Sequence, residues 1–126
     1  MLEILIDPEG HGDIDEELGL DDSILCAGCG ALVTRTRWRL AMDGDHERTF
    51  FNPAGHVFRV LCFREAPGVA ATGNPSDEFT WFKGYLWTFA LCQGCGDHLG
   101  WRYEGDADPR IFFGLIKNSL SHSHSP

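Results

Sequence analysis

Two matched Cys-x-x-Cys motifs, each followed directly by glycine, constrain the fold of this chain more than any other feature. The first contains Cys26 and Cys29, and the second contains Cys92 and Cys95. Each motif supplies two thiolates from one tight turn, and a structural zinc ion takes four such ligands in a tetrahedron. Because the motifs lie far apart in the chain, one ion would tie the start of the folded part to its last third. We therefore expect one structural zinc ion per chain, held by these four cysteines.

Two other uses of the four cysteines are a redox dithiol and a pair of disulfide bonds. A redox Cys-x-x-Cys is typical of a βαβ pattern, which this sequence lacks. Disulfides are rare in the cytoplasm, and the N-terminus has neither the basic segment nor the cleavage site of a secretory signal. We expect a cytoplasmic protein with metal-bound thiols.

Cys62 and His98 are two further residues that could act as a nucleophile or as a metal ligand. Cys62 lies between Leu61 and Phe63 in an apolar run, which predicts a buried, inert thiol. His98 lies three residues after Cys95, so it is a candidate fifth ligand. With four thiolates at hand, a role in orienting the site or in packing fits His98 better.

Length and charge limit the classes of partner. The 126 residues suit one domain, and the longest apolar runs are too short to cross a bilayer. A net charge of −9 disfavours nucleic acids and anionic membranes, because both need a basic face. The charge is uneven, since residues 1–34 contain no lysine or arginine. We expect an acidic, loosely ordered arm at 1–22, in which Leu2, Ile4 and Ile6 could form a short edge strand. The folded domain should span 23–120, and a polar tail 121–126.

Hydrophobic patterning predicts a mostly-β domain. Strands are expected at 33–41, 49–51, 57–63, 86–91 and 99–103, with turns at 42–46 and 52–55. The near-continuous apolar run 57–63 is typical of a strand buried on both faces. Residues 66–76 contain two prolines and two glycines, which predicts an exposed loop. Asp108-Pro109 is a helix-start signal, although the β-favouring residues after it limit any helix to about one turn.

Three of the four tryptophans, Trp81, Trp87 and Trp101, lie around the second cysteine motif. A buried tryptophan covers about 150–250 Å², and its N–H usually needs a partner. Three of them beside a metal site suggest a rigid recess for a small, neutral molecule. Considered alone, such a cluster is slightly more often packed core. Trp38 lies apart from the others, and we assign it to packing.

Together these residues resemble the CULT domain, the thalidomide-binding domain of the cereblon family, in the stand-alone form found in bacteria. The resemblance covers about residues 23–120 and includes both cysteine motifs. Its other motifs are Asn52-Pro53-x-Gly55, Trp81-Phe82-x-Gly84-Tyr85-x-Trp87-Thr88 and His98-x-Gly100-Trp101. The resemblance implies a β-tent, in which two roughly orthogonal antiparallel sheets are pinned at one end by zinc.

The resemblance also implies a pocket walled by Trp81, Trp87 and Trp101. Its ligands would be cyclic imides, such as the glutarimide of thalidomide-type compounds, uracil-like rings, and protein C-termini cyclised from Asn or Gln. In the family, the backbone before the first tryptophan binds the imide. Here the Phe79 carbonyl would accept from the imide N–H, and the Trp81 N–H would donate to a ring carbonyl. The residues placed at or near the pocket by position are Asn52, Pro53, Phe58 and Tyr103.

The chain departs from animal cereblons at three of these positions. Phe79 and Thr80 replace a His-Ser pair, so a side-chain hydrogen bond at Phe79 is lost, whereas the backbone contacts should survive. Tyr103 stands where a different aromatic residue is usual. The protease-like and helical domains of full-length cereblon have no counterpart in this sequence, so the ubiquitin-ligase adaptor role is not expected.

Two other functions remain open at this point. A methionine sulfoxide reductase of the B type shares a zinc-pinned β architecture, but it needs a reactive cysteine, which only Cys62 could supply. A protein-interaction module of the zinc-ribbon kind would show an exposed apolar patch in place of a recess. No nucleophile-base arrangement or pair of carboxylates stands out, so we expect a binding module and not an enzyme.

Overall fold

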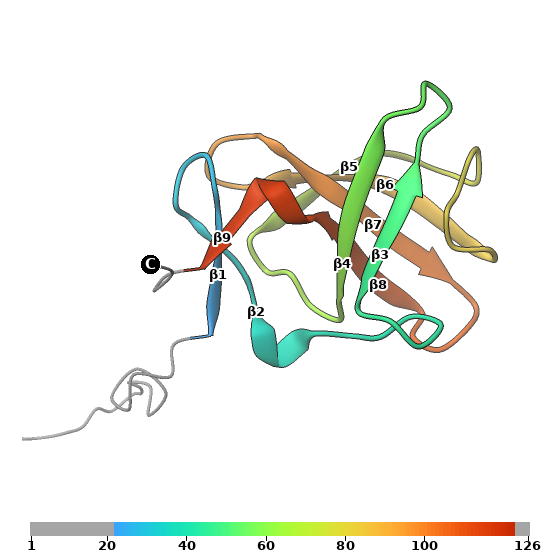
Figure 1. The fold of residues 1–126 in the computed structure, drawn as a ribbon, viewed down its shortest axis with the longest axis horizontal. Coiled ribbons are helices and arrows are strands. Elements are labelled where there is room, and N and C mark those ends of the chain that lie inside the picture. The colour runs from blue at the N-terminus through green and yellow to red at the C-terminus, as the bar shows by residue number, and fades with distance from the viewer. Residues whose placement is uncertain (1–21, 123–126) are drawn as a thin grey trace, which may run out of the picture.

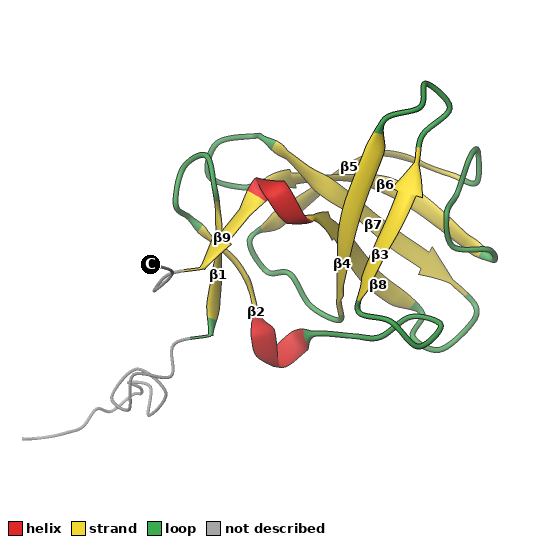
Figure 2. Cartoon of the chain, in the orientation of Figure 1, coloured by secondary structure: helices red, strands yellow, loops and turns green. Residues whose placement is uncertain are grey.

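The computed structural model describes residues 22–122, whereas 1–21 and 123–126 lie outside the described part (Figure 1). The expected acidic arm, with Leu2, Ile4 and Ile6, is therefore outside it except for Asp22. No helix within residues 22–122 has the length and apolarity needed to cross a membrane. The strands are β1 (Ser23–Cys26), β2 (Leu32–Arg35), β3 (Glu47–Phe51), β4 (Val57–Phe63), β5 (Val69–Ser76), β6 (Tyr85–Cys92), β7 (His98–Gly105), β8 (Ile111–Ile116) and β9 (Leu120–His122). Two short 3-10 helices are η1 (Thr36–Trp38) and η2 (Lys117–Ser119) (Figure 2).

The strands form two antiparallel sheets, which confirms the mostly-β class and the two-sheet arrangement. The small sheet has the order β2-β1-β9, and the large sheet has the order β3-β4-β8-β7-β6-β5. In Figure 1 the small sheet lies on one side of the molecule and the large sheet on the other. Every strand pair in both sheets is antiparallel, so neighbouring strands place residues of one face directly opposite each other.

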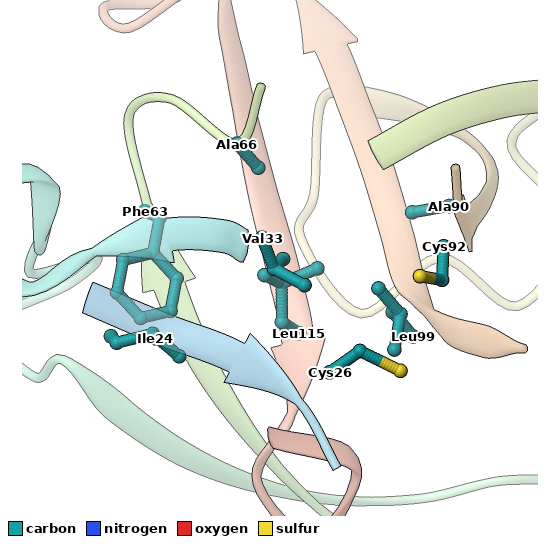
Figure 3. Packing of buried hydrophobic residues seen from close by; sticks show 9 residues of the cluster. All are labelled: Ile24, Cys26, Val33, Phe63, Ala66, Ala90, Cys92, Leu99 and Leu115. Atoms are coloured by element: carbon teal, nitrogen blue, oxygen red, sulfur yellow. The ribbon is translucent and has the colours of Figure 1, made fainter. Parts of the chain in front are cut away.

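Two hydrophobic clusters cover opposite faces of the large sheet. Alternation along β4 shows the division, because Phe63 belongs to the first cluster and Cys62 to the second. The first cluster joins the large sheet to the small one (Figure 3) and consists of Ile24, Cys26, Val33, Phe63, Ala66, Ala90, Cys92, Leu99 and Leu115. The second consists of Leu40, Val60, Cys62, Phe82, Tyr85, Trp101, Tyr103 and Phe112.

Strand β4 has the predicted bounds 57–63, but it is buried on both faces only in its second half. Val57 is 56% exposed, whereas Val60, Cys62 and Phe63 are fully buried. The reason is the register. β8 pairs with β4 only from Val60 onward, so the first half of β4 has a partner on one edge alone.

The strand predicted over 33–41 is wrong beyond Arg35. β2 ends there because its partner β1 begins at Ser23, which pairs with Arg35. The chain then turns through η1, where the Thr36 N–H donates to the Asp22 carbonyl at 2.9 Å. The Asp22 carboxylate accepts from Arg35 Nη1 at 3.2 Å and from Arg37 Nε at 2.8 Å.

The loop predicted over 66–76 is also wrong, because β5 occupies 69–76. β5 is the last strand of the large sheet, so it pairs with β6 on one side only. An edge strand tolerates proline and glycine, and the pairing register shifts between Thr72 and Ser76, around Gly73 and Pro75.

The end of the chain differs from expectation in two places. No helical turn follows Asp108-Pro109, since β8 begins at Ile111 and pairs with β7. The β preference of this segment outweighs the helix-start signal. The small sheet continues through β9 to His122, two residues into the expected polar tail.

Candidate functional site

A cavity of about 310 Å³ opens on the face of the large sheet that is remote from the small sheet. This volume lies at the lower end of the range of small-molecule sites. Side chains of β4, β6 and β7 and of the two connections β3–β4 and β5–β6 line it. The lining residues are Asn52, Pro53, Phe58, Glu78, Phe79, Trp81, Trp87, Phe89, His98, Trp101 and Tyr103. The structure thus brings together all eight residues that the sequence analysis placed at a pocket.

The three indoles stand as walls around an open space. The rings of Trp81 and Trp101 meet edge to face, with centroids 4.9 Å apart and planes at 79°. Trp87 contacts Phe89 instead, with centroids 5.1 Å apart. The rings have not collapsed into a packed core, because the cavity remains between them.

Backbone carbonyls fix two of these indoles. Trp81 Nε1–H donates to the Phe51 carbonyl at 3.1 Å, and Trp87 Nε1–H donates to the Glu78 carbonyl at 2.9 Å. Trp81 also stacks on Phe50, with centroids 4.8 Å apart and planes at 2°. The walls are therefore held in place by the protein itself, which reduces the ordering cost of binding a ligand.

The segment before Trp81 presents unpaired backbone groups at the mouth of the cavity. Phe79 is 70% exposed and has a φ of +56°, a conformation that is uncommon for a residue other than glycine. The turn is fixed by the Thr80 N–H, which donates to the Asp77 carbonyl at 3.3 Å. Within residues 22–122, the Phe79 carbonyl and the Trp81 N–H have no hydrogen-bond partner. An acceptor and a donor are thus available two residues apart.

Three lining residues were not predicted as part of the pocket: Glu78, Phe89 and His98. The signal for Phe89 was available, because Phe89 follows Trp87 at the two-residue period of a strand. The signal for His98 was its place in the motif that ends at Trp101. Glu78 directly precedes Phe79, but nothing in its residue type pointed to an aromatic recess.

His98 is part of the cavity wall. Its Nε2–H donates to the Gly100 carbonyl at 2.9 Å, and its ring meets Trp101 edge to face with centroids 5.1 Å apart. A similar contact joins it to Phe89, with centroids 5.5 Å apart. Burial lowers the pKa of His98, although the Gly100 carbonyl opposes this effect. The imidazole is therefore neutral at pH 7.

Tyr103 lies deep in the site and Cys62 lies behind it. Tyr103 is 1% exposed, and burial raises the pKa of its hydroxyl, with the nearby Cys62 adding to the effect. Cys62 is fully buried, and burial raises the pKa of its thiol to about 12. Cys62 does not line the cavity. A protonated thiol without access to the cavity is a poor nucleophile, which argues against the sulfoxide reductase alternative.

The other cysteines form one compact group. The Sγ atoms of Cys26, Cys29, Cys92 and Cys95 all lie within 4.8 Å of one another, and none is in a disulfide. The Cys26–Cys95 and Cys29–Cys92 sulfur distances are 3.7 and 3.6 Å. Four sulfurs at about 2.3 Å from a tetrahedral ion would be about 3.8 Å apart. The group can therefore hold a metal ion.

The two cysteine turns have the same backbone geometry. The N–H of Gly30 donates to the Cys26 carbonyl, and that of Gly96 donates to the Cys92 carbonyl, both at 2.8 Å. Both glycines have a φ near +80°, at 81° and 83°, which glycine adopts without strain. This explains why glycine follows each motif.

The crowded sulfurs also affect each other's protonation. Burial raises the pKa of Cys92, but N–H groups of Cys95 and Gly94 and the neighbouring sulfurs outweigh it and lower this pKa to about 7. The Asp97 N–H lowers the pKa of Cys95, yet burial and the other three sulfurs raise it to about 12. Four thiolates this close need a cation to balance their charge.

Cereblons from several animals are similar in sequence to most of this chain. No protein-family model matches the chain. Cereblon from Gallus gallus is 38% identical over 104 residues, which is 78% of this chain and 23% of that protein. Cereblon from Xenopus tropicalis is 35% identical over 122 residues, covering 82% and 27%. Cereblon from Drosophila virilis is 32% identical over 117 residues, covering 85% and 18%. The chain spans about a quarter or less of the length of these relatives.

Proposed function

Because this chain carries a domain of the cereblon family, we propose that its aromatic cavity binds small cyclic imides. The ligand class comprises glutarimide rings, uracil-like rings and protein C-termini cyclised from Asn or Gln. One observation carries the proposal. Three tryptophans enclose an open cavity, and the unpaired Phe79 carbonyl and Trp81 N–H lie at its mouth. A bacterial origin, a cytoplasmic location and a binding role in place of catalysis belong to the same proposal.

The chemistry of an imide suits this arrangement. An imide presents one N–H donor between two carbonyl acceptors, and glutarimide has a hydrocarbon back. The Phe79 carbonyl accepts from the imide N–H, and the Trp81 N–H donates to one ring carbonyl. Leaving such a group unpaired in a dry cavity costs about 1–3 kcal/mol, so rings without the N–H should bind more weakly. The indole faces of Trp81, Trp87 and Trp101 cover the hydrocarbon back.

A ring-opened analogue should be rejected. Its carboxylate would lose water against indole faces, which is costly without a cationic partner. Glu78 also lines the cavity, and its carboxylate would repel a second negative charge. With few atoms in the ligand, we expect affinity for the imides of about micromolar strength.

We also propose that the metal held by the four cysteines is zinc, one ion per chain. An all-sulfur set at tetrahedral spacing is typical of structural zinc, although it also suits iron. The bound ion supplies a structural cross-link and no chemistry to the cavity. Cys26 belongs to β1 and Cys92 to β6, so this cross-link would join the small sheet to the large one.

A titration followed by tryptophan fluorescence tests the imide proposal. Glutarimide should quench the fluorescence and bind more tightly than uracil, and a ring-opened glutamine derivative should show no binding. Trp87→Ala should weaken glutarimide binding by at least about tenfold, because one wall of the cavity is removed. Trp38→Phe is the matched control, since Trp38 lies in η1 away from the cavity. Equal binding of the ring-opened acid, or an unchanged affinity in Trp87→Ala, would contradict the proposal.

A further inference from the structure

Aromatic rings bound the cavity on several sides. Most of its lining residues are phenylalanine, tyrosine or tryptophan. The ring centroids of Trp81, Trp101 and Phe58 lie 4.9 to 5.6 Å from one another, and the plane of Trp101 is steeply inclined to the other two, at 79° and 89°. Trp87 and Phe89 meet at a similar angle of 73°. Rings arranged in this way form a box and not a stack, so a ligand that touches one ring lies close to others.

The charge of the cavity lining favours a cation. Within residues 22–122, no lysine or arginine lines the cavity, whereas the acidic residue Glu78 does. His98, which also lines it, is neutral at pH 7 because burial lowers its pKa. The whole chain has a net charge of −9, which attracts cations from solution. Aromatic rings add to this preference, because a ring attracts a cation through its electron-rich face, and tryptophan does so most strongly.

The scarcity of hydrogen-bond acceptors in this lining decides which kind of cation fits. A primary ammonium group has three N–H donors, and each donor left without a partner in a dry cavity is costly. A quaternary ammonium group has no N–H, and its charge is spread over apolar methyl groups. It can therefore lie against aromatic rings without hydrogen bonds, and the cavity of about 310 Å³ suits a compound of this small size.

We propose that the cavity also binds small quaternary ammonium compounds, for which choline is the probe. The binding energy comes from the aromatic rings and from the negative charge of Glu78. The Phe79 carbonyl and the Trp81 N–H, which would bind an imide, are not needed for this second class of ligand. Binding of choline is therefore independent of whether the cavity accepts imides.

The test compares choline with dimethylbutanol, the alcohol of the same shape in which a carbon atom replaces the charged nitrogen, by isothermal titration calorimetry at pH 7. Wild type should bind choline at least about threefold more tightly than the alcohol, because the attraction between the cation and the rings adds to the same apolar contact. Trp87→Leu keeps an apolar wall but removes a ring, so it should weaken choline at least about threefold more than the alcohol. Glu78→Gln should also weaken choline more than the alcohol. Asp77→Asn is its matched control, because Asp77 is the neighbouring acid in the chain and does not line the cavity. It should weaken choline less than Glu78→Gln does.

Three outcomes would overturn this inference. The first is equal binding of choline and the alcohol by wild type, which would mean that the charge contributes nothing. The second is unchanged choline binding in Trp87→Leu, which would place choline outside the cavity. The third is an equal effect of Glu78→Gln and Asp77→Asn on choline, and this comparison decides the question if Trp87→Leu does not fold. Glutarimide is titrated separately. Binding of choline without glutarimide would contradict only the imide proposal, and binding of glutarimide without choline would contradict only this inference.

Discussion

At the scale of single residues, two kinds of polar group define the cavity. Some are hydrogen-bonded within the protein and fix its walls, and others have no partner and are available to a ligand. The indoles of Trp81 and Trp87 donate to backbone carbonyls, and the His98 ring donates to Gly100. These contacts set the walls before any ligand arrives. Within residues 22–122, the Phe79 carbonyl and the Trp81 N–H have no partner, and an imide would need these two groups.

His98 makes ligand binding depend on pH. Burial lowers the pKa of His98 below 6.5, so the neutral ring is present above pH 6.5 and protonation occurs as the pH falls through the lowered pKa. A charged ring beside Trp101 and Phe89 must lose water when a ligand fills the cavity. We expect glutarimide affinity to be constant from pH 8 to about pH 6.5 and to decrease at lower pH, measured by titration at each pH.

The control for this effect is His98→Gln, which removes the titrating group. Its affinity should vary less with pH than that of wild type over the same range. Glu78 also lines the cavity and Asp97 precedes His98 in the chain, so their charges have to be considered together with that of His98. Metal content must be measured in parallel, because thiolates release metal in acid. An identical pH profile in both proteins would show that His98 is not responsible.

The residues of the cavity were predictable to different degrees, for physical reasons. The eight residues that the structure brings together belong to, or lie near, motifs with a family resemblance, whereas Phe89 was treated only as part of a strand. Its position was implied by the two-residue period from Trp87. The positive φ of Phe79 could not be predicted, since nothing in a phenylalanine favours that conformation. It depends on the surrounding turn.

At the scale of elements, the prediction errors share a cause. The strand propensity of a segment depends on its own residues alone, whereas the point at which a strand ends also depends on the strand that pairs with it. β2 ends at Arg35 because β1 begins opposite it, and β5 forms despite Pro75 because it needs a partner on one edge only. Segments that are buried on both sides, such as the second half of β4, were predicted well because their apolar character is unambiguous.

Asp22 lies directly before β1 and its hydrogen bonds tie the start of β1 to η1. Replacing its carboxylate should therefore destabilise the fold. Its carboxylate accepts from Arg35 and from both the side chain and the backbone N–H of Arg37. The hydrogen bond from the Arg37 side chain is the largest cause that lowers the pKa of Asp22 below 3.8. We expect Asp22→Asn to reduce the free energy of unfolding by about 0.5–1.5 kcal/mol, measured by urea denaturation.

The sign of the pH dependence follows from the lowered pKa of Asp22. This contribution is fully present above pH 3.8 and is lost as the pH falls through the lowered pKa. Asp43→Asn is the control, because the Asp43 side chain is 81% exposed and its pair with Arg48 is long, at 3.4 Å. It should change stability by less than about 0.5 kcal/mol. Equal losses in the two variants would mean that the Asp22 contacts contribute nothing specific.

At the scale of the whole molecule, two sheets are joined by one apolar cluster and one group of sulfurs. The two-sheet arrangement was expected from the resemblance of the motifs to a known family, because the cysteine spacing alone predicts a cross-link between distant segments and not a division of the strands into two sheets. The order of the six strands in the large sheet could not, since sequence patterns do not show which strands become neighbours. The order also brings together β4, β7 and β6, whose side chains line the cavity.

Removal of the metal should separate the sheets. We expect one zinc per chain by elemental analysis, and a large drop in melting temperature after treatment with a strong chelator, because structural zinc is worth roughly 10–16 kcal/mol in apparent binding free energy. Cys95→Ser should lower zinc content below one per chain. Cys62→Ala should keep one zinc, since Cys62 is outside the sulfur group. A chain that melts at the same temperature with and without chelator would contradict this role.

The sulfur group and the aromatic cavity are joined by a very short stretch of chain. His98 follows Cys95 by three positions and lies against Trp101. Because only two residues separate Cys95 from His98, a shift of the second cysteine turn should also move His98, and with it the wall of the cavity. Ligand binding in the cavity and metal binding by the four sulfurs should consequently strengthen each other, so the affinity for a ligand should fall when the metal is removed.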